Sequence, residues 1–156
     1  LSKNLLVFVL NTFNKIPESL INFRVVCHPL RILSDSFFYD KSKTNLICPY
    51  SMMEKKFRKL INIKNKLIYD FGLKINTRKK FKVEKKFVQL PQPLAIAYTI
   101  GVCSAGGVSK IFLAGFDGFK KDDVNSDDTN IFFKNLKVGK KKDFIKFVTK
   151  TNYKLN

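Results

Sequence analysis

Residues 91–118, PQPLAIAYTIGVCSAGGVSKIFLAGFDG, carry the clearest fold signal in the chain. Residues 94–105 place apolar side chains on every side of a helix, which predicts a helix buried all round. Pro93 suits its first turn, where the missing N–H has no partner. Gly101, Ser104 and Ala105 are small enough to let another backbone approach closely, and the glycine pair 106–107 suits the left-handed conformation that ends many helices. We therefore expect a buried helix that ends at a glycine cap.

The helix leads into a short apolar run and a glycine-flanked acid. Residues 110–114, KIFLA, predict a continuous apolar strand of the type that parallel sheets cover on both faces. Ligands of open α/β sheets bind beyond the carboxyl ends of the strands. Gly115, Asp117 and Gly118 follow this strand, so we take them as candidate ligand contacts. A solvated acid in a Phe-Asp-Gly turn is the competing interpretation.

Strands and helices alternate along the rest of the chain. Apolar runs predict strands at residues 4–10, 23–27, 45–48 and 144–148. Short extended pieces at 67–69 and 73–75 and a lysine-guarded, edge-like strand at 78–86 form a hairpin-like insert. Helices or helical turns are expected at residues 17–22, 30–33 and 131–138, and after a capping box formed by Ser51 and Glu54. This order predicts an α/β fold, a Rossmann-like three-layer sandwich with a mostly parallel sheet, in a single domain over residues 1–156.

Length and composition favour a folded domain without a membrane span. The 156 residues can bury a real core, and 45% of them are hydrophobic. No window approaches the roughly 18 uninterrupted apolar residues that cross a bilayer. No secretory signal is evident, and Cys27, Cys48 and Cys103 are odd in number without CxxC spacing. We therefore expect free, buried thiols and a cytoplasmic location. Because Leu1 replaces an initiator Met and a strand follows almost at once, we expect a C-terminal fragment of a longer protein.

The formal charge of +18 invites a nucleic-acid interpretation. Only four of the 30 basic residues are arginine, however, and specific nucleic-acid sites rely on arginine for bidentate contacts. The abundance of Lys, Asn, Phe and Ile is typical of AT-rich genomes, which explains the lysine excess without selection for phosphate binding. No helix-turn-helix, zinc-finger or aromatic RNA-binding signature is present. We expect no nucleic-acid partner.

No metal site is expected from the sequence. His28 is the only histidine, and no pair of cysteines has the spacing of zinc ligands. Four aspartates lie within residues 120–130, but the glycine and terminal glutamate of a calcium loop are missing. A solvated loop is the favoured interpretation of that segment.

Several phrases of the sequence resemble one family. They are LNTFNKIPESLINFRVVCHPLRILSD at 10–35, DFGLKI at 70–75, LPQPLAIAYTIGVCSAGGVSKIFLAGFDGFKKDD at 90–123 and FVTKTNYKL at 147–155. Together they look like the Rossmann-like domain at the C-terminus of bacterial aldolase-like proteins from lipopolysaccharide and O-antigen gene clusters. In that arrangement a barrel of the hydroxymethylglutaryl-lyase or 4-hydroxy-2-oxovalerate aldolase type precedes the domain. The resemblance implies such a barrel as an N-terminal partner in the parent protein.

Residues 98–119 are more distantly similar to a helix–strand unit of bacterial lipooligosaccharide sialyltransferases and of hydroxymethylpterin diphosphokinase-like domains. Both families hold a nucleotide on a Rossmann-like sheet, and in both an acid follows the strand that corresponds to residues 110–114, at the position of Asp117. Their glycine-rich phosphate turn is missing here, so we expect the sheet to lack its first strand and phosphate loop. The resemblance implies a nucleotide or nucleotide-sugar as the ligand.

Polar residues at two other strand ends complete the candidate site. His28 and Arg31 follow the second predicted strand, and the arginine fork suits a phosphate or carboxylate. The alternative is that His28 caps the strand end and Arg31 pairs with Asp35. Asn11 and Thr12 follow the first strand and are candidates to bond a base or ribose, or they form a plain turn.

Two functions from different classes follow from these observations. The first is a nucleotide- or nucleotide-sugar-binding domain of bacterial surface-polysaccharide synthesis, of a glycosyltransferase-like type. The alternative is a non-catalytic accessory domain that docks an aldolase-type protein, because the phosphate loop and the barrel are both missing. A lysine-rich surface that binds nucleic acid or anionic lipid is a weaker third.

Overall fold

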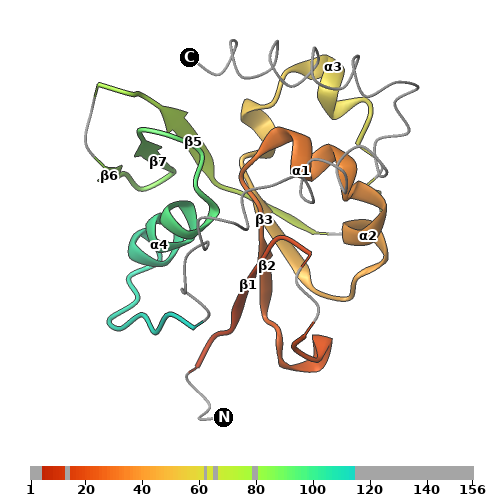
Figure 1. The fold of residues 1–156 in the computed structure, drawn as a ribbon, viewed down its shortest axis with the longest axis horizontal. Helices are drawn as coiled ribbons and strands as arrows, with labels where there is room; N and C mark the ends of the chain where they lie inside the picture. The colour runs from red at the N-terminus through yellow and green to blue at the C-terminus, as the bar shows by residue number, and fades with distance from the viewer. Residues whose placement is uncertain (1–4, 13–14, 62, 65–66, 79–80, 115–156) are drawn as a thin grey trace, which may run out of the picture.

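Four parallel strands form the larger of two sheets and succeed one another across it in chain order (Figure 1). The computed structural model describes residues 5–12, 15–61, 63–64, 67–78 and 81–114, so the elements predicted at 131–138 and 144–148 lie outside the described residues. Leu10 lies opposite Val25, and Val25 opposite Ile47. The prediction of an α/β fold with a mostly parallel sheet is confirmed. The strands are β1 (Phe8–Leu10), β2 (Phe23–Val25), β3 (Asn45–Cys48) and β4 (Ile68–Asp70).

Helices cover one face of this four-stranded sheet. They are α1 (Pro29–Ser34), α2 (Ser36–Lys41) and α3 (Lys55–Arg58), with the 3₁₀ turns η1 (Glu18–Leu20) and η2 (Tyr50–Met52) in the connections. Successive side chains of a strand point to opposite faces, so alternate residues face the helices. The buried residues on this side are Val26, Ile32, Tyr39, Leu46, Cys48, Met53 and Ile61.

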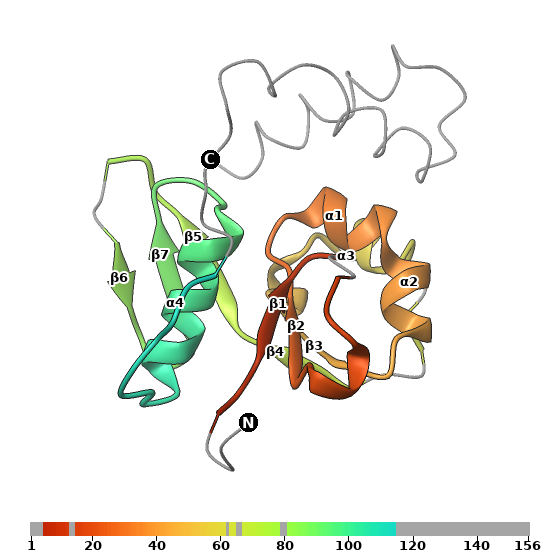
Figure 2. The ribbon, with the colours of Figure 1, turned by 60° about the horizontal axis from the view of Figure 1, so that its bottom comes forward.

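The opposite face packs against a second, three-stranded sheet and the helix α4 (Ala95–Ala105). Beyond β4 the chain passes through Phe71 into β5 (Gly72–Ile75), which pairs in parallel with β7 (Phe87–Leu90). β6 (Lys82–Val83) pairs antiparallel with β7 on the other side. Figure 2 shows the four-stranded sheet between the helical layer and this mixed layer. The core here consists of Val25, Cys27, Ile47, Leu73, Val88, Leu90 and Tyr98.

α4 lies close against β7 because position 101 has no side chain. A Cβ at Gly101 would lie 2.7 Å from Cγ2 and 2.8 Å from Cβ of Val88, much closer than two carbons can approach. The predicted close approach to the helix is therefore found at Gly101, where the neighbour is the side chain of Val88 rather than a backbone, and not at Ser104, which is exposed.

A hydrogen bond fixes the position of α4 along the sheets. Tyr98 is fully buried, and its hydroxyl donates to the carbonyl oxygen of Phe71. The two rings also lie against each other, with their centroids 6.0 Å apart. Since Phe71 joins β4 to β5, the bond holds α4 at the point where the chain passes from one sheet to the other.

α4 ends as the sequence predicts. Gly106 is the C-cap and Gly107 has a φ of 73°. The N–H of Val108 donates to the carbonyl of Cys103, and the N–H of Gly107 to that of Ser104, each at 3.1 Å. This pair of bonds is the Schellman motif.

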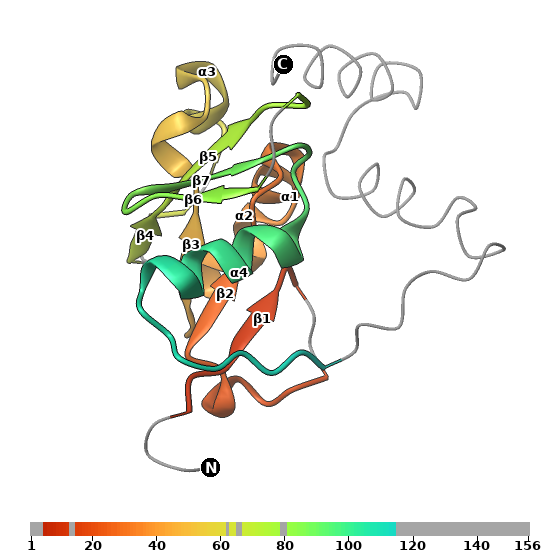
Figure 3. The ribbon, with the colours of Figure 1, turned by 90° about the vertical axis from the view of Figure 1, so that its left-hand side faces the viewer.

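The start and the burial of α4 differ from the predictions. Leu94 is the N-cap, so Pro93 lies before the helix rather than in its first turn. Tyr98, Thr99, Gly101 and Cys103 are buried, whereas Ser104 is exposed. The expectation of burial all round is wrong because α4 lies in an outer layer and has the sheets on one side only (Figure 3).

Tertiary packing also created elements that the sequence did not predict. The sequence predicts no helix at the position of α2, and aromatic residues such as Phe37 and Phe38 are weak helix formers. Complete burial of Tyr39 against the sheet stabilises this helix. β7 is the central strand of the second sheet, and the sequence predicts no strand at its position. The edge-like strand predicted at residues 78–86 is found in part, as the two-residue edge strand β6.

The predicted capping box is wrong. Glu54, not Ser51, precedes α3, and it makes no side-chain cap bond. The N–H of Ser51 donates instead to the carboxylate of Asp70, at 3.2 Å. Ser51 is the middle residue of the turn η2, which ends before Glu54 and holds Ser51 next to the end of β4.

The prediction of a buried strand at residues 110–114 is also wrong. The segment belongs to neither sheet, and all five residues are exposed, Phe112 by 81%. An apolar run indicates a tendency toward burial, whereas a strand also needs a neighbour to pair with. Here the segment lines a hollow with β1 and α4.

Among the described residues, no helix is long and apolar enough to cross a membrane.

Gly101→Val should destabilise the protein by about 1–3 kcal/mol, because the added side chain would overlap Val88 in a packed core. Gly106→Ala is the matched control, since a Cβ there meets only two carbonyl oxygens at 3.5 Å, an ordinary contact. Urea unfolding followed by circular dichroism measures both variants. Equal transition midpoints would contradict the close packing of α4 on β7.

Tyr98→Phe should lower stability by about 1–3 kcal/mol, because the carbonyl of Phe71 loses its donor inside the protein. Tyr39→Phe is the control. Tyr39 is equally buried, and its hydroxyl has no hydrogen-bond partner within the described part of the chain, so its removal should be neutral or stabilising. Thermal unfolding of the two variants gives the comparison, and a loss that is no larger for Tyr98→Phe would disprove the anchoring role of its hydroxyl.

Candidate functional site

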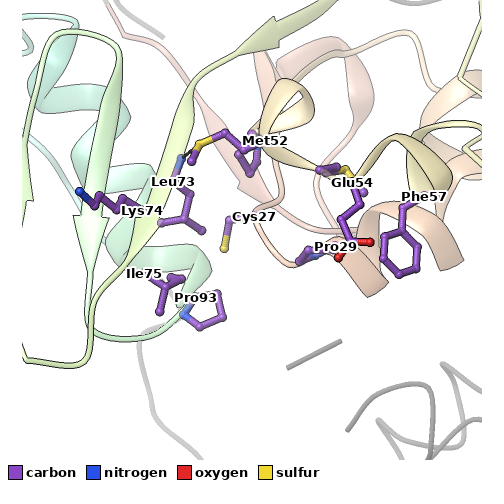
Figure 4. Close-up of a pocket in the computed structure, with 11 residues that line it drawn as sticks. Cys27, Pro29, Met52, Glu54, Phe57, Leu73, Lys74, Ile75 and Pro93 are labelled. Atoms are coloured by element: carbon purple, nitrogen blue, oxygen red, sulfur yellow. Dashed lines mark hydrogen bonds between the residues drawn. The ribbon is translucent and has the colours of Figure 1, made fainter. Parts of the chain in front are cut away.

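A cavity of about 290 Å³ opens where β2 and β3 end (Figure 4). Cys27 and Pro29 follow β2, and Pro49 follows β3, so the cavity lies beyond the carboxyl ends of two adjacent parallel strands. This is the edge at which open α/β sheets bind ligands. The full lining is Cys27, Pro29, Pro49, Met52, Met53, Glu54, Phe57, Leu73, Lys74, Ile75 and Pro93.

A proline after each of the two strands explains why the chain turns away and leaves the cavity unfilled. Pro29 is the first residue of α1, and Pro49 is the N-cap of η2. Proline has no N–H and a fixed φ, so neither strand continues its ladder past this edge and the chain turns away. The facing wall comes from β5 through Leu73 and Ile75, and from Pro93 ahead of α4 (Figure 4).

The cavity walls are mainly apolar and carry two charged residues. Figure 4 shows the Glu54 carboxylate facing the cavity beside Pro29. One of its oxygens lies 3.0 Å from the ammonium of Lys56, which balances its charge from outside the cavity. Lys74 lines the opposite wall with its stem, and its ammonium group points away (Figure 4). The group that faces the interior is thus a hydrogen-bond acceptor.

A shallower groove adjoins the cavity. Met52 and Lys74 line both, so the two spaces are neighbours. The groove carries Lys85 and Lys86 as well as Lys74, and its one acid, Asp70, accepts a hydrogen bond from the Ser51 N–H. The three lysines outnumber this acid, so the groove carries an excess of positive charge, which attracts anions.

The thiols near the cavity are poor nucleophiles. Cys27, Cys48 and Cys103 are all buried and free, as the sequence predicts. Burial raises the pKa of Cys27 and of Cys48 to about 12, and it raises the pKa of Cys103 as well. Since the thiolate is the reactive form, Cys27 offers the cavity a neutral thiol at physiological pH.

The predicted residues Asn11 and Thr12 lie at the end of β1, away from the cavity lining. Asn11 adopts a left-handed φ of 52°, which asparagine tolerates better than most residues. Its N–H donates to the carbonyl of Val25 at 2.9 Å, and its own carbonyl accepts from Arg24. Asn11 therefore forms the turn after β1, and its backbone groups bond to Arg24 and Val25 of the neighbouring strand β2.

His28 and Arg31 also lie beside the cavity rather than in it, although the neighbours Cys27 and Pro29 line it. The Nδ1 of His28 accepts a hydrogen bond from the Leu30 N–H at 3.3 Å and caps α1. Arg31 lies 3.7 Å from the carboxylate of Asp35. The contact of Arg31 with Asp35 is the one that the structural alternative predicts, whereas His28 caps the start of α1 rather than the end of β2. A ligand role for either residue stays a prediction.

The third predicted group, Gly115, Asp117 and Gly118, lies outside the described residues. So do the four aspartates of residues 120–130. Within the described ranges, no group of three or more His, Cys, Asp or Glu side chains could hold a metal ion.

Sequence reasoning missed the residues that do line the cavity. Glu54 was interpreted as half of a capping box, and Lys74 as part of a short strand. The usable signal was the pair of prolines that closely follow two apolar strands, at positions 29 and 49, because both stop their strands at the same edge of the sheet.

The buried cation Arg24 was also missed. Its side chain is 1% exposed, and its guanidinium lies over the ring of Phe38 with 4.9 Å from Cζ to the ring centroid. Nη2 lies 3.6 Å from a carboxylate oxygen of Glu18, which also accepts a hydrogen bond from Ser42 at 2.6 Å. Because a buried charge needs such partners, Arg24 links β2 to η1 and α2 and is structural.

No model of a protein family matches this sequence, and neither does any curated protein or solved structure. The family resemblance therefore remains a prediction, and the geometry of the cavity and groove carries the argument for function.

The stability of the protein should fall as the pH falls below about 6.5, the ordinary pKa of histidine. Burial, and then the neighbouring charge of Arg31, lowers the pKa of His28, so below pH 6.5 the unfolded chain binds a proton that the folded one does not. The neutral form of His28 therefore adds its full amount to the free energy of unfolding above pH 6.5. This addition is lost as the pH falls toward the pKa that His28 has in the folded protein. His28→Asn keeps an N-cap acceptor without titrating, so urea midpoints at pH 7.5 and 5.0 should differ less for it than for the wild type. An equal pH dependence would refute the assignment.

Proposed function

We propose that this chain is a Rossmann-like domain that binds a nucleotide or nucleotide-sugar in bacterial surface-polysaccharide synthesis. One observation supports a ligand of the nucleotide type. An apolar cavity at the carboxyl ends of parallel strands adjoins a groove with three lysines. A nucleotide has two parts that match these spaces: a base with its sugar, which suits the apolar cavity, and a chain of phosphates, which suits the lysines of the groove. The family resemblance supplies the cellular process.

The cavity suits the base and sugar end of such a ligand. Its volume of about 290 Å³ lies at the lower end of small-molecule sites, which suits one ring system with a sugar rather than a whole nucleotide-sugar. Pro29, Pro49 and Phe57 offer apolar contacts. The Glu54 carboxylate accepts hydrogen bonds from ribose hydroxyls or from an exocyclic amino group.

The phosphates would then lie in the adjoining groove. Lys74 borders both spaces, and Lys85 and Lys86 continue along the groove. Lysine binds phosphate as a point charge rather than as a fork, so these contacts supply charge more than geometric specificity. The proposal is one of binding, and the Cys27 thiol, whose pKa burial raises to about 12, has no catalytic role in it.

Isothermal titration of the protein with UMP, UDP, CMP, GDP, UDP-sugars and CMP-sugars tests the ligand class. At least one should bind with a Kd below about 1 mM, which corresponds to roughly −4.1 kcal/mol. Binding of a base-bearing nucleotide should exceed that of inorganic pyrophosphate, because the latter leaves the cavity empty. If none of these ligands binds, the proposal fails, and a non-catalytic accessory domain becomes the better supported function.

Variants locate the bound ligand. Glu54→Gln, and separately the pair Lys74→Glu and Lys85→Glu, should each weaken binding about tenfold or more, or about 1.4 kcal/mol. The pair Lys55→Glu and Lys59→Glu is the charge-matched control, because both lysines are exposed and line neither the cavity nor the groove. Equal losses for the two lysine pairs would show a nonspecific charge effect and contradict the site.

A further inference from the structure

We infer that one exposed face of α3 and of the turn after it binds the surface of an anionic lipid membrane. We call this surface, which consists of Lys55, Lys56, Lys59 and Leu60, the α3 face. All four residues are exposed. None of them lines the cavity or the groove, so the inference does not depend on the proposed nucleotide.

Helical geometry places these four residues on one side. The N–H of Lys59 donates to the carbonyl of Lys55 at 3.2 Å. The N–H of Leu60 donates to the carbonyl of Phe57 at 3.0 Å, so the helical turn continues past the end of α3. With about 3.6 residues per turn, the α3 face covers less than half of the helix circumference. The other side carries Phe57, which is partly buried, and Ile61, which is buried in the core.

Positive charge on this segment exceeds negative charge. Residues 51–64 contain five Lys and Arg side chains and one acid, Glu54. Lys56 lies 3.0 Å from that acid, whereas Lys55 and Lys59 form no ion pair with any described residue. Clusters of about 4–8 basic residues on an amphipathic helix are typical of surfaces that bind anionic lipid headgroups. The α3 face therefore complements the charge of an anionic bilayer.

Exposed apolar side chains favour a lipid partner over a nucleic acid. Leu60 is 62% exposed, and Met52, which precedes α3, is 53% exposed. Met52 and Phe57 both line the cavity, so apolar side chains continue from the turn of the α3 face to the cavity. A phosphate backbone pairs with lysines but offers no apolar layer, whereas a bilayer accepts apolar side chains below its headgroups. The lysine stems can lie along the same layer with their ammonium groups at the headgroups.

α3 lies where a flat membrane can reach it. Figure 1 and Figure 3 show α3 at one end of the molecule, beyond the ends of β1 to β4. Glu54, the N-cap of α3, and Phe57 line the cavity. Contact of the α3 face with a bilayer would therefore place the cavity beside the headgroups, within reach of a molecule that is anchored in the membrane.

Co-sedimentation of the full chain with lipid vesicles tests the inference. Vesicles of phosphatidylcholine with about 30 mol% phosphatidylglycerol should bind the protein at least about tenfold more strongly than vesicles of phosphatidylcholine alone, because each lysine near an anionic surface adds to the attraction. Binding should weaken as the salt concentration rises from about 0.05 M to about 0.5 M, since ions screen the charges. Equal binding to the two kinds of vesicle, or binding to neither, overturns the inference.

Charge-matched variants locate the contact. The pair Lys55→Glu and Lys59→Glu should weaken binding to the anionic vesicles at least about tenfold. The pair Lys43→Glu and Lys110→Glu is the control, because both lysines are exposed and lie outside residues 51–64. It should weaken binding by no more than about threefold, since charges far from the contact are screened. Equal losses for the two pairs would show a general attraction of a basic protein and overturn the inference.

Leucine variants test the apolar part of the contact. Leu60→Ala should weaken binding to the anionic vesicles about threefold or more, because it removes apolar area from the lipid layer. Leu67→Ala is the matched control, since Leu67 is 60% exposed and lies ahead of β4, outside the α3 face. Equal binding by the two variants would refute the lipid contact of Leu60.

A DNA duplex of random sequence tests the other anionic partner. It should bind the wild type more weakly than the anionic vesicles do, because it gives Leu60 no apolar layer. Tighter binding to DNA that is lost in the Lys55→Glu and Lys59→Glu pair would assign the α3 face to nucleic acid and overturn the inference.

Discussion

The hydrogen bond from the Tyr98 hydroxyl to the Phe71 carbonyl joins the two halves of this structure. Phe71 is the residue at which the chain leaves the four-stranded sheet and enters the three-stranded one. The bond, with the contact of Gly101 on Val88, positions α4 against both sheets. It thereby fixes β5 and the start of α4, which supply one wall of the cavity. A change in this packing would alter the cavity without touching its lining.

The cavity and the groove follow from chain direction as well as packing. Parallel strands bring the ends of β2 and β3 to one edge, and a proline after each strand turns the chain away from it. β5 then faces that edge because it continues the line of β4 through Phe71. Charge is divided between the two spaces, with the Glu54 carboxylate in the cavity and lysines along the groove.

Polar residues at strand ends were sound candidates, yet the described ones form local structure. Asn11 adopts the left-handed turn after β1, His28 caps α1, and Arg31 lies beside Asp35. Each of these residue types can play two roles at the end of a strand. The polar groups that could bind a ligand can also form hydrogen bonds with backbone groups that are left unpaired where the strand pairing ends. Sequence spacing does not distinguish these uses. The cavity residues Glu54 and Lys74 come from a short helix start and a second sheet, whose placement depends on the whole fold.

The sequence alone determined the parallel α/β order, the limits of β3 and the glycine cap of α4. These features depend on interactions within a few residues: a compact apolar run, a proline stop, and a glycine that accepts a positive φ. Tertiary structure decided the rest. α2 forms because Tyr39 is buried against a sheet, and β7 is central because it pairs with β5 on one edge and β6 on the other. Residues 110–114 lie outside both sheets despite a strand-like pattern. An apolar pattern indicates that burial of the segment lowers the free energy. Which surface buries the segment depends on residues that are distant in the chain.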